Sequence, residues 1–158
     1  MIRFEFHDSN NNSDFIKNLL NVIIRNKQDV YWGVGDIEIV PQYQGDYPGS
    51  GNHDYREIAL KFGEKIEREK LVYVTSVELF EILDDTQSIR SGVFVCFSNS
   101  CPFDYNFRPK LETKCANEMQ HEMAYLEVRI LDGDIFTILS GDSELLIILA
   151  ETFHSSLV

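Results

Sequence analysis

Residues 125–139 read YLEVRILDGDIFTIL, and this stretch decides the fold class. Runs of β-branched and other apolar residues flank Asp132-Gly133-Asp134, and a short Asp-Gly turn between two such runs is a strong signal for a β-hairpin. A hairpin joins antiparallel strands, so the stretch favours an antiparallel sheet over the parallel sheet of a strict α/β fold. Polar residues then cap a final helix, which we expect over residues 144–153.

The rest of the chain supplies further strands and helices, with no internal repeat and no sign of a second domain. Apolar periodicity predicts strands at 2–7, 30–40, 71–74 and 92–97, helices at 14–27, 54–70 and 75–83, and a further short helix at 110–122. Two segments read as irregular: a long loop at 42–52 and an aromatic loop at 98–109. We therefore expect residues 1–158 to form a single α+β domain. Its mixed, mainly antiparallel sheet should pack with three to five helices, and its C-terminal hairpin should be followed by a helix.

Individual residues indicate how these elements begin and bend. Asn12 or Ser13 suits the N-cap of the first helix, and Thr75 with Glu78 has the spacing of a capping box. Two glycines interrupt the apolar run of residues 30–40, which predicts either a bulged strand or two short strands.

Charge excludes several classes of function. The 158 residues contain 14 Lys and Arg against 26 Asp and Glu, a formal net charge of −12. Binding to nucleic acid or to an anionic membrane normally needs clustered Lys and Arg, so we expect neither. The three cysteines are an odd number and suit a reducing compartment, and the charged N-terminus is unlike a signal peptide. We expect a soluble, cytoplasmic protein.

One string of residues carries a resemblance to an enzyme family. Gly51-Asn52-His53-Asp54, with Gly35-Asp36 and His7-Asp8 upstream, resembles fragments of the calcineurin-like metallophosphoesterases. The resemblance implies His and Asp ligands for two divalent metals that activate water against a phosphate ester. The family's Asp-x-His and Gly-His-x-His blocks are absent. The alternative is that residues 52–54 close a loop and cap the following helix.

The cysteines allow a second metal hypothesis. Cys96, Cys101, Cys115 and His121 are enough ligands for one zinc ion, although structural zinc sites usually have tighter spacing. Cys96 lies in an apolar strand, where a free cysteine commonly packs as a small hydrophobe. We expect no bound cofactor or metal. The chain also lacks the motifs of a nucleotide-phosphate loop and of a serine nucleophile.

Acidic clusters with nearby aromatic residues favour a protein-binding surface. The candidate partner-binding residues are Glu78, Glu81, Asp84, Asp85, Asp132, Asp134, Tyr43, Tyr47, Tyr105 and Phe107. Carboxylates steer a basic partner and buried aromatics supply lasting affinity, whereas the alternative is a merely solubilising surface. We expect a basic protein partner, as for an inhibitor or immunity protein that occludes a nuclease toxin. The alternatives are a small metal-dependent phosphoesterase and a housekeeping domain.

Overall fold

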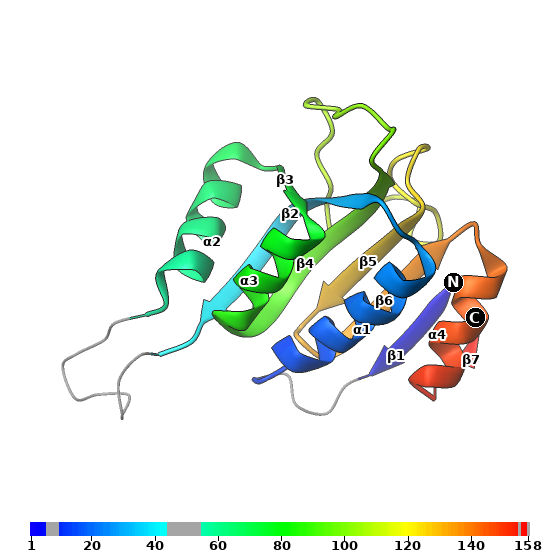
Figure 1. Ribbon diagram of the computed structural model, residues 1–158, viewed down its shortest axis with the longest axis horizontal. Coiled ribbons are helices and arrows are strands. Elements are labelled where there is room, and N and C mark those ends of the chain that lie inside the picture. Colours follow the sequence, from blue (N-terminus) through cyan, green and yellow to red (C-terminus); the bar gives the residue numbers. More distant parts are fainter. Residues whose placement is uncertain (6–9, 44–54, 155, 158) are drawn as a thin grey trace.

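The computed structural model describes residues 1–5, 10–43, 55–154 and 156–157. In this part the chain forms a seven-stranded antiparallel sheet in the order β3-β2-β4-β5-β6-β1-β7, together with four helices (Figure 1). The elements are β1 (Ile2–Glu5), α1 (Ser13–Asn26), β2 (Val30–Pro41), α2 (Glu57–Glu69), β3 (Val72–Thr75), α3 (Ser76–Asp84), β4 (Thr86–Ser98), β5 (Leu126–Leu131), β6 (Ile135–Ser140), α4 (Ser143–Thr152) and β7 (Ser156–Leu157). The predicted α+β domain, with its C-terminal hairpin and following helix, is confirmed.

The two faces of the sheet are covered differently. The helices pack on one face, and the main core lies between them and strand residues such as Trp32 and Phe94 (Figure 1). The opposite face carries a second cluster around Tyr31, Val95 and Phe97, which residues from the irregular segment 99–125 cover. Side chains alternate between the faces along each strand, so neighbouring residues of one strand serve both cores.

The predicted local signals mostly form as expected. Thr75 and Glu78 make a complete capping box at α3. The Asp142 side chain accepts a hydrogen bond from the Leu145 N–H at the start of α4. The hairpin turn has positive φ at both Asp132 and Gly133, as a type I′ turn requires. Local rules decided these features because the partners lie within a few residues of each other.

Three predicted boundaries need correction. The short helix expected at 110–122 is wrong: the segment is irregular and is held by hydrogen bonds to the sheet. β4 begins at Thr86 rather than at residue 92, because its first half also pairs with β2 and buries Thr86, Ser88 and Ile89. α2 begins at Glu57 with Arg56 as N-cap, and the expected capping role of Asp54 lies outside the described residues.

β2 and β4 form a ribbon that extends past their other neighbours. They pair from Val30 to Pro41, with register shifts after Gly35 that confirm a bulged strand. β3 pairs with only residues 31–34 of β2, and β5 pairs with only residues 92–96 of β4. Half of each long strand therefore has no strand neighbour on its outer side within the described residues.

We call these two strand halves the overhangs of β2 and β4. The side chain of Asn12 hydrogen-bonds to the overhang of β4. Its buried side-chain amide donates to the Ile89 carbonyl of β4 at 2.8 Å and accepts from the Ile89 N–H at 2.8 Å. The same amide donates to the Gly133 carbonyl of the hairpin turn at 2.7 Å. Asn12 is the N-cap residue of α1 by position, but its side chain makes no cap hydrogen bond. Instead, its amide makes the hydrogen bonds to the Ile89 backbone that a neighbouring strand would make.

Candidate functional site: the β2–α2 groove

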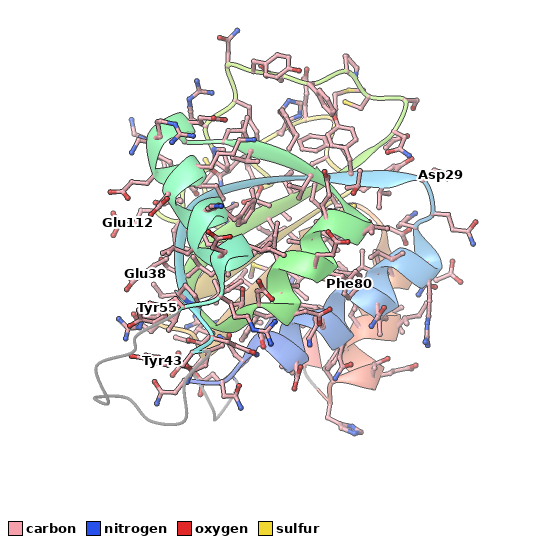
Figure 2. All side chains as sticks on the ribbon, turned by 60° about the vertical axis from the view of Figure 1, so that its left-hand side comes forward. Asp29, Glu38, Tyr43, Tyr55, Phe80 and Glu112 are labelled. Atoms are coloured by element: carbon pink, nitrogen blue, oxygen red, sulfur yellow. The ribbon has the colours of Figure 1, made fainter. Side chains whose placement is uncertain are left out.

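The second overhang, along β2, forms one wall of an open groove. The other wall is α2, and the hollow between them measures about 500 Å³. We call it the β2–α2 groove, lined by Asp36, Ile37, Glu38, Ile39, Pro41, Leu60, Gly63, Glu64, Ile66, Glu67 and Lys70. Figure 2 turns this side of the molecule forward, with Glu38, Tyr55 and Tyr43 one below the other along it. This volume falls within the range of known binding clefts.

Two glycines let the walls of the groove approach each other. A Cβ added at Gly63 of α2 would come within 2.7 Å of Ile39 Cγ2 on β2. A Cβ at Gly35 would come within 2.8 Å of the Lys70 carbonyl and 2.6 Å of Pro109 Cγ. A larger residue at either position would push a neighbouring element outward. The two glycines therefore allow β2 and α2 to lie close together.

The groove is strongly acidic. Four of its lining residues carry carboxylates, Asp36, Glu38, Glu64 and Glu67, against the single base Lys70. The pair on α2 is exposed and has no ion-pair partner among the described residues. One helical turn separates the two side chains, so both carboxylates lie on the same face of α2.

The two carboxylates on β2 are partly engaged. Asp36 has a positive φ of 48° at the bulge, and its carboxylate accepts a hydrogen bond from the Leu111 N–H at 2.7 Å. Glu38 forms an exposed ion pair with Arg90 at 3.1 Å. Both interactions are near the surface, so the two carboxylates keep most of their influence on an approaching charge.

The edge of β2 offers backbone groups as well as charge. Some of the backbone N–H and C=O groups of residues 36–40 point away from β4, although three register shifts between Gly35 and Pro41 interrupt the regular alternation of a strand. Among the described residues, no strand and no other backbone group pairs with this side. Within the described part of the chain, the groove therefore presents unpaired backbone groups of a bulged strand edge beside four carboxylates.

At one end of the groove the lining residues change from acidic to basic. A second hollow of about 440 Å³ begins there, lined by Asp36, Lys70, Arg108, Pro109 and Lys110. Three of these five residues are basic. The acidic stretch therefore ends near Lys70.

The predicted carboxylates at the start of α3 have different roles. Glu78 accepts from the Thr75 N–H at 2.7 Å and so helps to hold the N-terminus of α3 in place. Glu81 is exposed one turn later.

The carboxylates at the end of α3 are tied to other helices. Lys17 of α1 donates to Asp84 at 3.1 Å, and Arg56 approaches Asp85 at 3.4 Å. Asp85 is buried, with 8% of its surface exposed. These two residues join helices within this chain, and Asp85 presents little surface to a partner.

The hairpin carboxylates lie near that end of α3. Asn12 connects the hairpin turn to β4 close to where β4 begins, so Asp132 and Asp134 belong to the same end of the sheet as Asp84. Asp132 is exposed, whereas Asp134 is half-buried.

The predicted aromatic anchors do not gather on one surface. Tyr43 packs against Tyr55 with ring centroids 4.7 Å apart and ring planes tilted by 35°, near Asp85. Tyr105 is 71% exposed at the opposite end of the sheet, and Phe107 packs into the second core. Tyr47 lies outside the described residues. The predicted residues thus occupy two ends of the molecule.

The two metal-site hypotheses differ in how much of each site the structure describes. His7-Asp8 and Gly51-Asn52-His53-Asp54 lie outside the described residues, so the phosphoesterase hypothesis stays a prediction. Among the described residues no group of three or more His, Cys, Asp and Glu side chains gathers as metal ligands would. Cys96 packs in the helix-side core, whereas Cys101 packs against the cluster on the opposite face.

Comparisons with known proteins add no assignment. A scan against protein-family models, a search of curated proteins and a search of solved structures each found no match. In the described part of the chain, no helix has the length and apolar character needed to span a membrane.

Sequence reasoning missed most of the groove. Asp36 was noted only as a possible metal ligand, and Glu38, Glu64 and Glu67 were not singled out. The signal available was the run Ile37-Glu38-Ile39 in a predicted strand, followed by a predicted helix in which Glu64 and Glu67 are one turn apart. That run does not reveal that the strand edge is open.

Proposed function

We propose that this chain is a protein-binding module that holds a basic segment of a partner protein in the β2–α2 groove. The observation that carries the proposal is the combination of an open strand edge with four carboxylates and one lysine in a single groove. Charge complementarity of this kind speeds encounter and selects the partner.

The proposed mechanism is occlusion. A partner with a basic surface, such as the phosphate-binding surface of a nuclease toxin, would be covered when its basic segment occupies the groove. This corresponds to an inhibitor or immunity-type role. Exposed carboxylates outside the groove, such as Glu81 and Asp132, would add to the long-range attraction produced by the net charge of −12.

Affinity capture with a matched pair of variants tests the proposal. The groove variant is Glu64→Lys with Glu67→Lys, and the control is Glu144→Lys with Glu151→Lys on α4, also exposed. Each pair of substitutions adds four charge units and changes the net charge from −12 to −8. Circular dichroism and thermal unfolding establish that both variants are folded.

The expected result is a basic protein captured by the wild type and by the control from a lysate of the source organism, but not by the groove variant. Added salt should release it. Equal loss in both variants would show that net charge alone drives capture. Equal retention in both would show that the groove is not used. Either result would contradict the proposal.

A further inference from the structure

We propose that the partner's basic segment binds as an extended strand that hydrogen-bonds to the free edge of β2, adding an eighth strand to the sheet. This inference rests on the proposed function and specifies the conformation of the bound segment. Strand addition of this type is a recurring mode of peptide recognition, in which backbone hydrogen bonds supply affinity and side-chain pockets supply specificity.

The position for the added strand is the one that β3 leaves empty. β3 pairs with β2 only as far as the pair Val34–Val72. Before Val72 the chain turns away into α2 through Lys70, which has a positive φ of 67°. A segment in the groove would therefore continue the line of β3 along residues 36–41 of β2.

The two overhangs of the β2–β4 ribbon contrast with each other. On the β4 side, Asn12 satisfies both backbone groups of Ile89 with its own amide. On the β2 side, no described side chain does the same for residues 36–40. Unpaired strand edges readily template another strand, so an edge left open beside a groove is suited to an incoming one.

The charge of the groove selects the occupant. A second copy of this chain carries a net charge of −12 and would be repelled. Residues 44–54 contain two Asp and no Lys or Arg, so their charge does not complement the groove either. A segment with Lys or Arg at alternate positions would direct these side chains to one side of the added strand, towards Glu64 and Glu67 or towards Asp36 and Glu38, while its backbone pairs with β2.

The length of the pairing follows from the ends of the edge. Pro41 has no N–H to donate, and the acidic lining ends at Lys70, where the basic hollow begins. The edge from Asp36 to Pro41 spans at most about 17 Å, because it covers five residue steps and is bulged. The bound segment should therefore pair over about five residues.

The test uses a defined probe, an acetylated and amidated peptide of about eight alternating Lys and Val residues. Two isomers carry N-methyl groups on either the Lys or the Val residues, and each therefore loses the donors along one edge only. Nuclear magnetic resonance titration of the full chain measures the affinity, and amide hydrogen exchange measures the protection of residues 36–40.

Strand addition predicts slower exchange in residues 36–40 and a clear difference between the isomers. The isomer blocked on the edge that faces β2 should bind about tenfold more weakly than the parent peptide, and the other should bind like the parent. The groove variant Glu64→Lys with Glu67→Lys should bind more weakly than the Glu144→Lys with Glu151→Lys control.

Other outcomes overturn the inference and separate it from the proposed function. If both isomers bind like the parent while the groove variant binds weakly, side chains alone hold the segment, and only strand addition fails. If both charge variants bind alike, or if no saturable binding occurs up to about 1 mM, strand addition fails and the lysate capture decides the proposed function. A wild-type dimer in sedimentation velocity that the groove variant abolishes would assign the groove to a second copy.

Discussion

At the scale of single residues, Asn12 shows how one side chain can replace a strand. It is fully buried and joins α1, β4 and the hairpin turn through three hydrogen bonds. A buried polar side chain is tolerated in a core only when its partners are complete, as they are here.

Asn12→Ala should lower the free energy of unfolding by about 3 kcal/mol, because it leaves the N–H and C=O of Ile89 and the C=O of Gly133 without this partner. Urea denaturation measures the loss. The matched control is Asn11→Ala at the exposed neighbouring position, which should change stability by less than about 0.5 kcal/mol. Similar losses in both variants would contradict the structural role of Asn12.

The three cysteines should react in a definite order. Cys115 is exposed, Cys101 is half-buried and Cys96 is buried, and burial raises the pKa of the Cys96 thiol to about 12. A thiol reagent at mildly alkaline pH should therefore modify Cys115 first, while Cys96 reacts only after denaturation. Mass spectrometry of partly labelled protein checks this order, and early labelling of Cys96 would contradict the packing described.

The same thiol links stability to pH. The protonated form is favoured in the folded state, so the contribution of Cys96 is complete below its ordinary pKa of 9.0 and is lost as pH rises towards about 12. The unfolding free energy of the wild type should therefore fall across this interval by more than that of Cys96→Ala. Urea denaturation at pH values across the interval provides the comparison. Parallel curves for the two proteins would show that Cys96 does not contribute.

At the scale of elements, the irregular segment 99–125 covers a sheet face without forming a helix. Arg129 of β5 donates to the Ala116 and Glu118 carbonyls, and Gln120 donates to both carboxylate oxygens of Glu127. Glu127 and Arg129 also form a buried ion pair. The segment owes its shape to these polar contacts with β5, because its own periodicity does not specify a regular element.

Glu127→Ala should destabilise the fold by about 3–5 kcal/mol, since it leaves the buried Arg129 guanidinium without its counter-charge. Denaturation with urea gives the loss, and hydrogen exchange should show faster opening of residues 110–120. Glu118→Ala, whose side chain is exposed, is the control and should have little effect. A small loss for Glu127→Ala would mean that the apolar contacts alone hold the segment.

Gly63→Ala tests the close packing of α2 on β2. Alanine favours a helix by about 1 kcal/mol, but its Cβ would lie 2.7 Å from Ile39 Cγ2. Overpacking of this kind costs about 2 kcal/mol, so we expect a net loss of about 1 kcal/mol in thermal unfolding. Gly141→Ala lies outside the helices and is the control for an added methyl group without a clash, since no atom lies within 4 Å of its Cβ. A stabilised Gly63→Ala variant would show that α2 moves away freely.

At the scale of the whole molecule, net charge and the open strand edge act together. Carboxylates beside an unpaired edge discourage pairing between copies, and the net charge of −12 adds general repulsion. The same features admit a basic segment. Charge therefore serves both to keep copies apart and to select a partner.

Removing this charge should promote self-association. The isoelectric point is about 4.6, so the chain should be monomeric near neutral pH and associate as pH approaches that value. Sedimentation velocity across this pH range measures the change. A monomer that persists at the isoelectric point would show that charge is not what protects the edge.

Much of the fold was predictable because its determinants are local. The hairpin at residues 132–134, the capping box of Thr75 and Glu78, and the helical apolar stripes each depend on residues close together in the chain. The irregular path of residues 110–122 was not predictable, since its partners Glu127 and Arg129 contribute through contacts that no local pattern encodes. The groove was missed for the same reason.

The amino-acid sequence by itself therefore determined the fold class, the antiparallel hairpin, most helix positions and the acidic character of the surface. Only the tertiary structure decided which strand edge stays open, that Asn12 covers one overhang of the β2–β4 ribbon, and that Glu38, Glu64 and Glu67 line one groove. The physical reason is that turns, caps and periodicity are short-range preferences. The neighbours of a strand, by contrast, are selected by packing among residues far apart in the chain.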